Sequence, residues 1–296
     1  MVAPASPRDL RLAAITDEFS AHIDAALDAM QSVGMTGVEL RTIGGRNIIE
    51  FTDEEIDSVV AAARARRMEI VSLASPLLKC VLEGGPRVDA RFQQDVFGSP
   101  FTWDDQPRLT RRIFELTRLT GARLVRVFSF WRTVEPAACE DRVVEALAAL
   151  AGEAATHGVT IGLENEYACN VGTAGESARI LERLPFDNVR LIWDPANAFI
   201  LGDVPYPDAY RRLPRERVAH VHVKDCVMEH GRPRWEPPGA SIDWRGQIAA
   251  LVSDGYRGWL SLETHWRGPT GDRLEASTMC GARLREMVAD ARGGVA

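Results

Sequence analysis

Short apolar stretches alternate with longer amphipathic stretches along most of the chain. The apolar stretches are rich in β-branched residues, which is typical of buried strands, and the stretches between them have the spacing of helices that pack on one face. We expect a strand that runs into a loop at 12–19, further strands at 37–43, 69–75, 123–131, 159–166, 189–195, 218–225 and 258–265, and helices at 23–34, 52–68, 107–120, 136–157, 173–184, 207–213, 243–254 and 272–291. The helix at 52–68 opens with Thr52 and Glu55, the pattern of a capping box.

Eight strand–helix units predict a closed barrel. Strands that alternate with helices run parallel, and eight units in 296 residues predict an α/β protein with one (β/α)8 TIM-barrel domain over residues 1–296. A doubly wound open sheet is the alternative, but it would normally show a glycine-rich loop after the first strand, where this chain has "ITDEF". The rhythm breaks at 76–106, after the third strand. Because loops this long in compact domains are usually functional, we expect it to cover the active-site face.

Charge and cysteine content narrow the class of protein. The net charge is -7 with no basic run, so a nucleic-acid partner is not expected. The five cysteines are widely spaced without a CxxC pair, which argues against a disulfide framework and for a reducing compartment. The N-terminus "MVAPASPRDL" lacks the apolar core of a signal peptide, and no apolar run is long enough to span a membrane. The sequence therefore predicts a cytoplasmic protein with no membrane partner.

Polar residues stand at the ends of the last four expected strands. In a TIM barrel the active site lies where strands end and the following loops begin. One of these strands, "VAHVHVKD", alternates valine with His220, His222 and Lys224, which share one face. The candidate residues at these ends are Glu164, Glu166, Asp194, Asn197, His220, His222, Lys224, Glu263 and His265, with Glu39 and Arg126 on earlier strands. Each alone is more often a helix cap or a core residue, but together they indicate a site.

The clustered carboxylates predict a metal ion. Buried carboxylates are costly without a compensating cation, so we expect one divalent ion bound by Glu164, Asp194, His222 and Glu263. His222 is nearer the end of its strand than His220, which is expected about 6.5 Å deeper as a supporting or core contact. Three carboxylates and one imidazole favour Mn²⁺, followed by Mg²⁺, Co²⁺ and Zn²⁺.

Four motifs carry a family resemblance. The segments "GLENE", "IWDPANA", "HVHVKD" and "LSLETH" resemble the sugar phosphate isomerase/epimerase families of the xylose-isomerase-like barrel superfamily. The resemblance implies metal-ligand roles for Glu164, Asp194, His222 and Glu263, and substrate contacts for Lys224 and Asn197. Glu166, Arg126, His220 and His265 are further candidates for substrate binding. By resemblance, the metal polarises a substrate carbonyl, and Glu164 and Glu263 remove and return a proton beside it.

Two departures from the relatives keep the reaction open. Ketose 3-epimerases carry an acid at the place of Asn170 and a histidine at the place of Asn197. The predicted function is a metal-dependent isomerase or epimerase of a small ketose, keto-inositol or related sugar. The alternative is a lyase: a keto-inositol dehydratase, or the large subunit of a C-glycoside-cleaving enzyme that acts on 3-keto glycosides. The partner would be a small carbohydrate, with a homo-oligomer expected, or a small second subunit in the lyase case.

Two further classes fit the residues less well. A repair endonuclease on the same barrel would hold three zinc ions and need more than the six histidines of this acidic chain. A non-catalytic sugar-binding or assembly module would not need four metal ligands.

Overall fold

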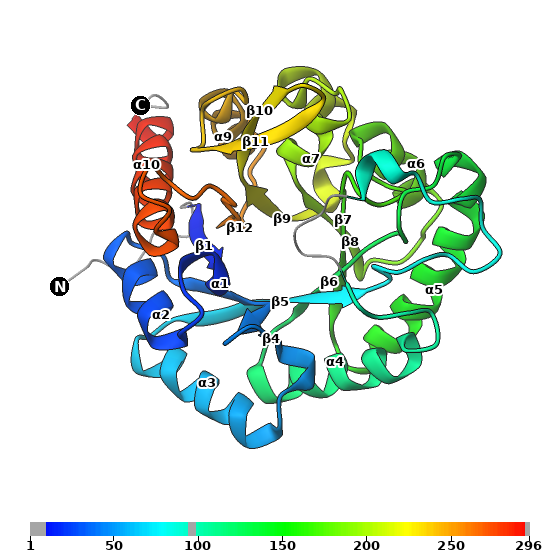
Figure 1. The fold of residues 1–296 in the computed structure, drawn as a ribbon, viewed down its shortest axis with the longest axis horizontal. Helices are drawn as coiled ribbons and strands as arrows, with labels where there is room; N and C mark the ends of the chain where they lie inside the picture. The colour runs from blue at the N-terminus through cyan, green and yellow to red at the C-terminus, as the bar shows by residue number, and fades with distance from the viewer. Residues whose placement is uncertain (1–9, 94–98, 294–296) are drawn as a thin grey trace.

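Eight parallel strands form a closed barrel at the centre of the protein (Figure 1). The structure is a computed structural model that describes residues 10–93 and 99–293. The barrel strands are β1 (Arg11–Ile15), β2 (Gly37–Leu40), β5 (Glu69–Leu77), β6 (Leu124–Val127), β7 (Thr160–Glu164), β8 (Val189–Trp193), β9 (Val218–Val223) and β12 (Trp259–Leu262). Each pairs with the next in this order, and β12 closes on β1. The predicted (β/α)8 barrel is confirmed.

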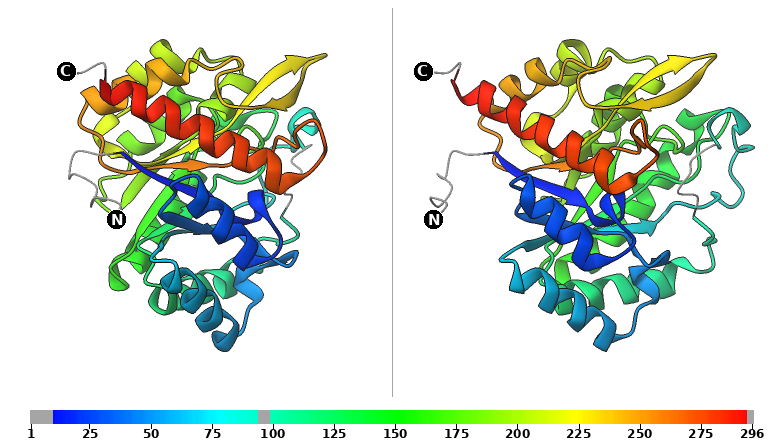
Figure 2. Two further views of the ribbon diagram at one scale, coloured as in Figure 1. Left: turned by 90° about the vertical axis from the view of Figure 1, so that its left-hand side faces the viewer. Right: turned by 60° about the vertical axis from the view of Figure 1, so that its left-hand side comes forward.

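Helices surround the barrel and cover the outer face of its strands (Figures 1 and 2). They are α2 (Ile23–Ser32), α3 (Asp53–Ala65), α4 (Gln106–Thr120), α5 (Glu140–Thr156), α6 (Ala174–Glu182), α7 (Pro195–Ile200), α8 (Tyr210–Arg212), α9 (Trp244–Ser253) and α10 (Arg273–Gly293). Short helical turns lie at η1 (Ile48–Glu50), η2 (Ala90–Phe92), η3 (Pro136–Cys139), η4 (Pro205–Ala209) and η5 (Arg215–Arg217). The predicted capping box opens α3, with Thr52 and Glu55 bonding each other's backbone N–H.

The barrel core is packed on both faces of its strands. Val221 and Val223 of β9 point outward and are fully buried among the helices. Inside the barrel, Ala13, Val71 and Trp259 form a small apolar cluster at the starts of their strands. A Cβ at Gly37 would lie 2.6 Å from the Trp259 ring, so only glycine allows the indole to fill this end. The apolar plug leaves the opposite end of the barrel for polar residues.

The first two stretches predicted as strands each end in another element. The stretch 12–19 leaves the sheet after Ile15 and forms the one-turn helix α1 (Thr16–Phe19). The stretch 37–43 leaves the barrel after Leu40, and its end forms β3 (Thr42–Ile43), which pairs with β4 (Arg46–Asn47). Gly44 and Gly45, both with positive φ, make this tight turn possible.

The stretch after β9 forms a hairpin. Strands β10 (Asp225–Glu229) and β11 (Arg232–Glu236) pair in antiparallel register and project from the barrel end (Figure 2). His230 and Gly231 at the turn both have positive φ, as a two-residue hairpin turn requires. Its base is fixed by the buried Asp225 carboxylate, which accepts backbone N–H bonds, including one from Gly239 at 2.8 Å.

The long loop runs from the end of β5 to the start of α4. Residues 94–98 of the expected loop, and residues 1–9 at the N-terminus, lie outside the described residues. All five cysteines are buried thiols without a disulfide, in line with their wide spacing. Across residues 10–93 and 99–293, none of the helices has both the length and the apolar character needed to cross a bilayer.

Candidate active site

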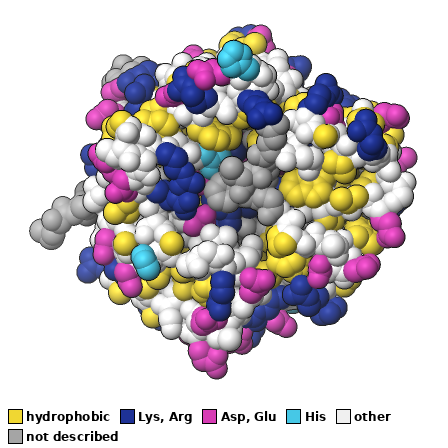
Figure 3. Space-filling view, in the orientation of Figure 1, with side chains coloured by type: hydrophobic (Ala, Val, Ile, Leu, Met, Phe, Trp, Pro, Cys, Tyr) yellow, Lys and Arg dark blue, Asp and Glu magenta, His cyan; other side chains and the backbone are white. Residues whose placement is uncertain are grey.

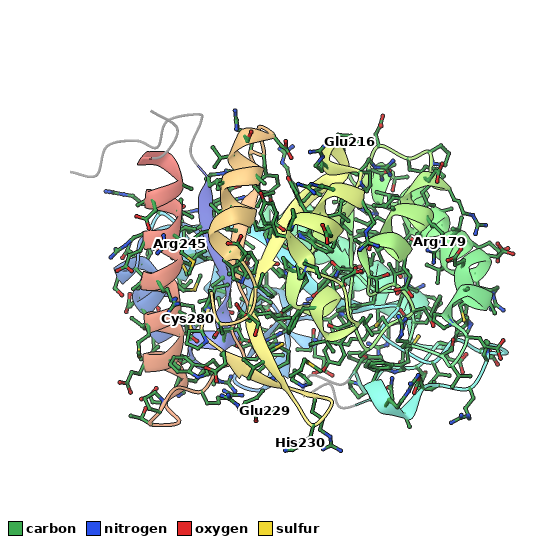
Figure 4. The ribbon with its side chains drawn as sticks, turned by 90° about the horizontal axis from the view of Figure 1, so that it is seen from above. Arg179, Glu216, Glu229, His230, Arg245 and Cys280 are labelled. Carbon is green, nitrogen blue, oxygen red and sulfur yellow. The ribbon has the colours of Figure 1, made fainter. Side chains whose placement is uncertain are left out.

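The predicted site residues gather at the end of the barrel where the strands finish. Figure 4 shows Glu229 and His230, at the tip of the hairpin, at this end, and Glu216, which precedes β9, at the other. A cavity of about 630 Å³ opens at the starts of the strands, where Tyr256 and Trp259 line it. Catalytic side chains are not expected at the starts of the strands, because the catalytic residues of TIM barrels come from the strand ends.

Four of the predicted residues converge on one buried point. Glu164 ends β7, Asp194 follows β8, His222 lies on β9 and Glu263 follows β12. Each is at most 3% exposed, and one ligand atom of each lies within 4.8 Å of the other three. Asp194 also caps α7, because its Oδ1 accepts the N–H of Asn197 at 2.9 Å. The structure thus brings together the four residues that the sequence singled out as metal ligands.

The atoms of this cluster fit a divalent cation. His222 Nδ1 lies 3.2 Å from Glu164 Oε1 and 3.4 Å from Glu263 Oε2. Asp194 Oδ2 and Glu164 Oε2 are buried and make no hydrogen bond in the described part of the chain, although each contacts a basic side chain. Unbonded carboxylate oxygens beside an imidazole nitrogen are the donors that Mn²⁺, Mg²⁺ and Zn²⁺ share.

Burial and the neighbouring basic groups shift the pKa values of the cluster in different directions. Burial raises the pKa of Glu263, but Lys224 and His222 outweigh burial and keep that pKa well below its usual range. Burial raises the pKa of Asp194 above its usual value, despite the Lys224 ammonium 2.8 Å away. Burial lowers the pKa of His222, but Glu164 and Glu39 outweigh it, so the pKa stands well above its usual value. Without a metal, an imidazolium and an ammonium therefore balance the cluster.

We expect metal binding to release a proton and to strengthen as pH rises. A metal needs neutral His222, whereas the carboxylates hold this ring protonated at neutral pH, so protons compete with the metal below the raised pKa. The affinity for Mn²⁺ should rise roughly tenfold per pH unit while about one proton is released. Titration calorimetry in two buffers of different ionisation enthalpy measures both quantities. His222→Gln should lose the metal, whereas His230→Gln, on the exposed hairpin turn, should not; an affinity independent of pH would contradict the prediction.

Two predicted substrate contacts border the cluster. Lys224 Nζ lies 2.8 Å from Asp194 Oδ2 and 3.1 Å from Glu263 Oε2. The Asn197 amide donates to Glu164 Oε1 at 3.3 Å. Its own oxygen is buried and accepts no hydrogen bond within the described residues, so one polar atom is left to face a ligand.

Arg126 lies at the boundary of the cluster. It is on β6, 5% exposed, and its Nη1 lies 3.2 Å from Glu164 Oε2 and 3.8 Å from Glu263 Oε1. Its charge therefore acts on both carboxylates for which a catalytic role was expected.

His220 lies below the cluster, beside the carboxylate of Glu39. Its Nε2 lies 2.8 Å from Glu39 Oε1, below the cluster, and its side chain borders the cavity at the opposite end. Glu39 Oε1 also lies 3.3 Å from Nε2 of His222 and accepts the hydroxyl of Ser261. Because side chains two apart on a strand are a full layer apart, His220 contacts the carboxylate that lies beside His222, and its assignment as a substrate contact stays a prediction.

Glu166 and His265 are turned toward protein partners. Glu166 lies beyond the end of β7 and accepts the N–H of Ala168 at 3.1 Å. The His265 Nδ1 lies 3.0 Å from Glu18 Oε1, and its ring meets Trp235 of the hairpin edge-on at 4.8 Å between centroids. Both assignments as substrate contacts stay predictions.

Sequence reasoning missed a second ionic network on the first two strands. Arg41 follows β2 and donates to Glu263 at 2.7 Å, to Glu18 at 2.6 Å and to both Asp17 oxygens. All four side chains are buried. Asp17 and Glu18 come directly after β1, in "ITDEF", so the strand-end argument that found the other residues could have found them.

Asn170 explains one departure from the ketose epimerases. Its Oδ1 accepts the N–H of Thr133 at 2.9 Å, and its amide donates to the carbonyls of Ser129 and Trp131. The side chain ties the loop after β7 to the loop after β6, a role that a carboxylate could not fill because it has no N–H to donate.

Comparison with known proteins places the chain in a family. A family profile described as xylose isomerase-like TIM barrel matches residues 27–283, well over half of the chain. Comparison with curated protein sequences gave no significant match. One similar solved structure is a fusion of a xylose isomerase-like TIM barrel with a 4-hydroxyphenylpyruvate dioxygenase. The match has 19% identity and a TM-score of 0.69, and it covers 94% of this chain and 42% of the fusion protein. It therefore spans under half of that protein.

Other similar structures match along their whole length. IolI with a bound zinc atom shares 16% identity, with 95% of this chain and 98% of that chain covered and a TM-score of 0.71. The E. coli 3-keto-D-glucoside 4-epimerase YcjR shares 18% identity, with 96% of this chain and 100% of that chain covered and a TM-score of 0.65. AsbF of Bacillus anthracis, described as a probable 3-DHS dehydratase, shares 15% identity, with 95% of this chain and 99% of that chain covered and a TM-score of 0.68. These identities show a shared fold. With the profile match they confirm the resemblance carried by the motifs: the chain belongs to the xylose isomerase-like TIM-barrel family.

Proposed function

We propose that this protein is a divalent-metal-dependent isomerase or epimerase of a small ketose, keto-inositol or related sugar. The observation that carries the proposal is the buried convergence of Glu164, Asp194, His222 and Glu263 beside Lys224 at the strand ends. A sugar epimerase and a zinc-binding protein among the similar structures support it. A divalent ion, with Mn²⁺ our first candidate, would polarise a substrate carbonyl and acidify the neighbouring C–H bond.

The residues of the chain supply the proton transfer. Glu263 is ionised, because Lys224 and His222 lower its pKa, so it is ready to accept a proton. Glu164, the second carboxylate, would first take up a proton from solvent and then return it to the substrate carbon, while the proton removed by Glu263 leaves to solvent. The Lys224 ammonium stabilises negative charge on the substrate oxygen as the proton leaves. Asn197 holds Glu164 in place through its amide.

A lyase or dehydratase of a keto sugar is the second candidate. It begins with the same proton removal, and differs because the resulting anion then expels a β-substituent. Two observations support this candidate. A probable dehydratase is among the similar structures. Asn170 stands where ketose 3-epimerases carry an acid, and its side chain is hydrogen-bonded to the backbone of Thr133. If the substrate is a 3-keto glycoside, we propose a hetero-oligomer with a small subunit; otherwise we propose a homo-oligomer.

Exchange of the α-proton with solvent tests the proposal. The Mn²⁺-loaded protein is incubated in D₂O with ketoses, keto-inositols and 3-keto glycosides, and NMR and mass spectrometry follow each compound. We expect deuterium at the carbon beside the carbonyl, with the skeleton retained. Loss of water or of an aglycone would move the assignment to the lyase. No exchange and no loss across the panel would contradict both reactions.

A further inference from the structure

Basic side chains gather on one side of the barrel mouth, beside the carboxylates of the cluster and beside Asp17. The carboxylates of the cluster follow β7, β8 and β12, in the second half of the chain. The ends of β2, β5 and β6 instead contribute basic side chains, and the start of α10 adds one more. These basic residues border a cavity of about 420 Å³, here called the basic pocket, which is lined among others by Arg41, Lys79, Arg126, Arg273, Phe101 and Phe128. Two acids, Asp17 and Glu50, also line it, and Asp17 is paired with Arg41, so basic side chains outnumber acidic ones. Figure 3 shows Lys and Arg side chains near the centre of this face.

The basic pocket adjoins the metal cluster. Arg41 and Arg126 line it, and the same two guanidinium groups contact Glu263 at 2.7 and 3.8 Å. A molecule in the pocket would therefore lie one arginine side chain away from the carboxylates that move the proton.

Arg126, which lines this pocket, has one buried donor without a hydrogen-bond partner among the described residues. Its Nη1 faces Glu164 and its Nη2 donates to the Ala74 carbonyl at 3.2 Å. Its Nε is buried and makes no hydrogen bond within the described residues. A buried guanidinium N–H without a partner is costly, so a ligand oxygen at this point would be stabilised. The Arg126 guanidinium carbon lies 4.7 Å from the centroid of the Phe128 ring, and this contact helps to hold the guanidinium group in place.

Arg273 forms no ion pair with an acid within 4 Å among the described residues. Its Nη1 donates to the backbone carbonyl of Asp17. Burial and the neighbouring Arg267 lower its pKa, while Glu18 and Asp17 act in the opposite direction. Lys79 lines the same pocket: it is 5% exposed, and its Nζ lies 4.7 Å from the centroid of the Phe128 ring.

We propose that the basic pocket binds an acid group of the substrate, a carboxylate or a phosphate, through Arg126, Arg273 and Lys79. The inference rests on the proposed function, because it takes the cluster to act on the carbonyl of the same molecule. The substrate is then a sugar acid or a sugar phosphate rather than a neutral sugar. Arginine suits both anions, because its planar fork of N–H groups matches their oxygens.

Neutralising the cluster does not account for these residues. Arg126 spends one nitrogen on Glu164, which leaves Nε unused, and Arg273 contacts no ligand of the cluster in the described structure. If the bases served the carboxylates alone, loss of Arg273 would leave the binding of small anions unchanged.

Matched neutral and acidic substrates test the inference. The Mn²⁺-loaded full chain is given D-fructose, 2-keto-D-gluconate or D-fructose 6-phosphate in D₂O, and exchange is followed by NMR. We expect kcat/KM for one acidic compound to exceed that for fructose at least tenfold, and the preferred compound names the acid group. Arg273→Gln should raise KM for that compound roughly ten- to hundredfold, with kcat and the fructose rate unchanged. Arg273→Lys should keep most of the preference, and Arg211→Gln, an exposed arginine, should change nothing.

Calorimetry with inorganic phosphate and acetate separates this inference from the proposed function. Exchange of fructose at the rate of the acids, or equal loss for all three in Arg273→Gln, would overturn the basic pocket and leave the proposed function standing. If no compound exchanges, but phosphate or acetate binds the wild type and not Arg273→Gln, the pocket is supported and the proposed function falls. Absence of both exchange and anion binding would overturn both.

Discussion

Replacing Glu263 by glutamine should lower α-proton exchange by roughly 10²- to 10⁴-fold, the range that a general base contributes. Glutamine keeps the size of the side chain but cannot accept the proton. Lys224 and Arg41 lie 3.1 and 2.7 Å from the Glu263 oxygens, so the change also leaves two buried bases without their carboxylate. The measurement is the rate of deuterium uptake from D₂O, at saturating Mn²⁺, with metal content determined for each preparation.

Metal content separates the two roles of this residue. Glu263→Gln that retains the metal but not the exchange identifies a base, whereas loss of the metal identifies a ligand. Glu140→Gln is the matched control, because Glu140 pairs at 2.7 Å with the exposed Arg179, which Figure 4 shows at the outer edge of the protein, and should keep the wild-type rate. A metal-loaded Glu263→Gln protein with wild-type exchange would contradict the role proposed for Glu263.

The strand-end argument predicted the cluster because barrel geometry leaves little freedom there. Parallel strands in register bring their ends to one level, so Glu164, Asp194, His222 and Glu263 had to meet once the barrel closed. The two-residue period of β9 likewise placed His222 above His220. The pattern could not say which partner a side chain meets; His220 is occupied by Glu39, a residue far away in the sequence.

Arg41 shows why part of the site was missed. An arginine after a short strand is ordinarily solvated, and this chain is rich in arginine, so "VELR" carried no signal for a buried guanidinium. Its burial depends on the one-turn helix α1, which turns Asp17 and Glu18 inward. The alternating pattern predicted a strand and a loop there, because a single helical turn is too short to have a period. The tertiary contact, rather than the local sequence, decides this half of the site.

Replacing Arg41 by methionine should destabilise the protein by about 3–5 kcal/mol, as expected when one member of a buried ionic group is removed. Asp17, Glu18 and Glu263 would each lose a cation within 3 Å, and their own side chains are almost fully buried. Burial raises the pKa of Glu18, but His265 and Arg41 outweigh it and keep that pKa well below its usual range. Urea unfolding of the metal-free protein at pH 7 measures the loss.

The pH dependence separates lost charge from lost packing. Because the folded-state pKa of Glu18 is depressed, its ion pair stabilises the wild type above the unfolded pKa, about 4.3, and this stabilisation is lost as pH falls toward the folded value. In Arg41→Met the unpaired carboxylates take up protons on acidification, so the difference from wild type should narrow between pH 7 and pH 4. Arg46→Met is the control: Arg46 pairs with Glu55 at 2.8 Å, but both side chains are exposed, so the cost should be about 1 kcal/mol or less. A difference between Arg41→Met and wild type that stays constant over this range would assign Arg41 to packing rather than to charge, because the volume of a methionine does not depend on pH.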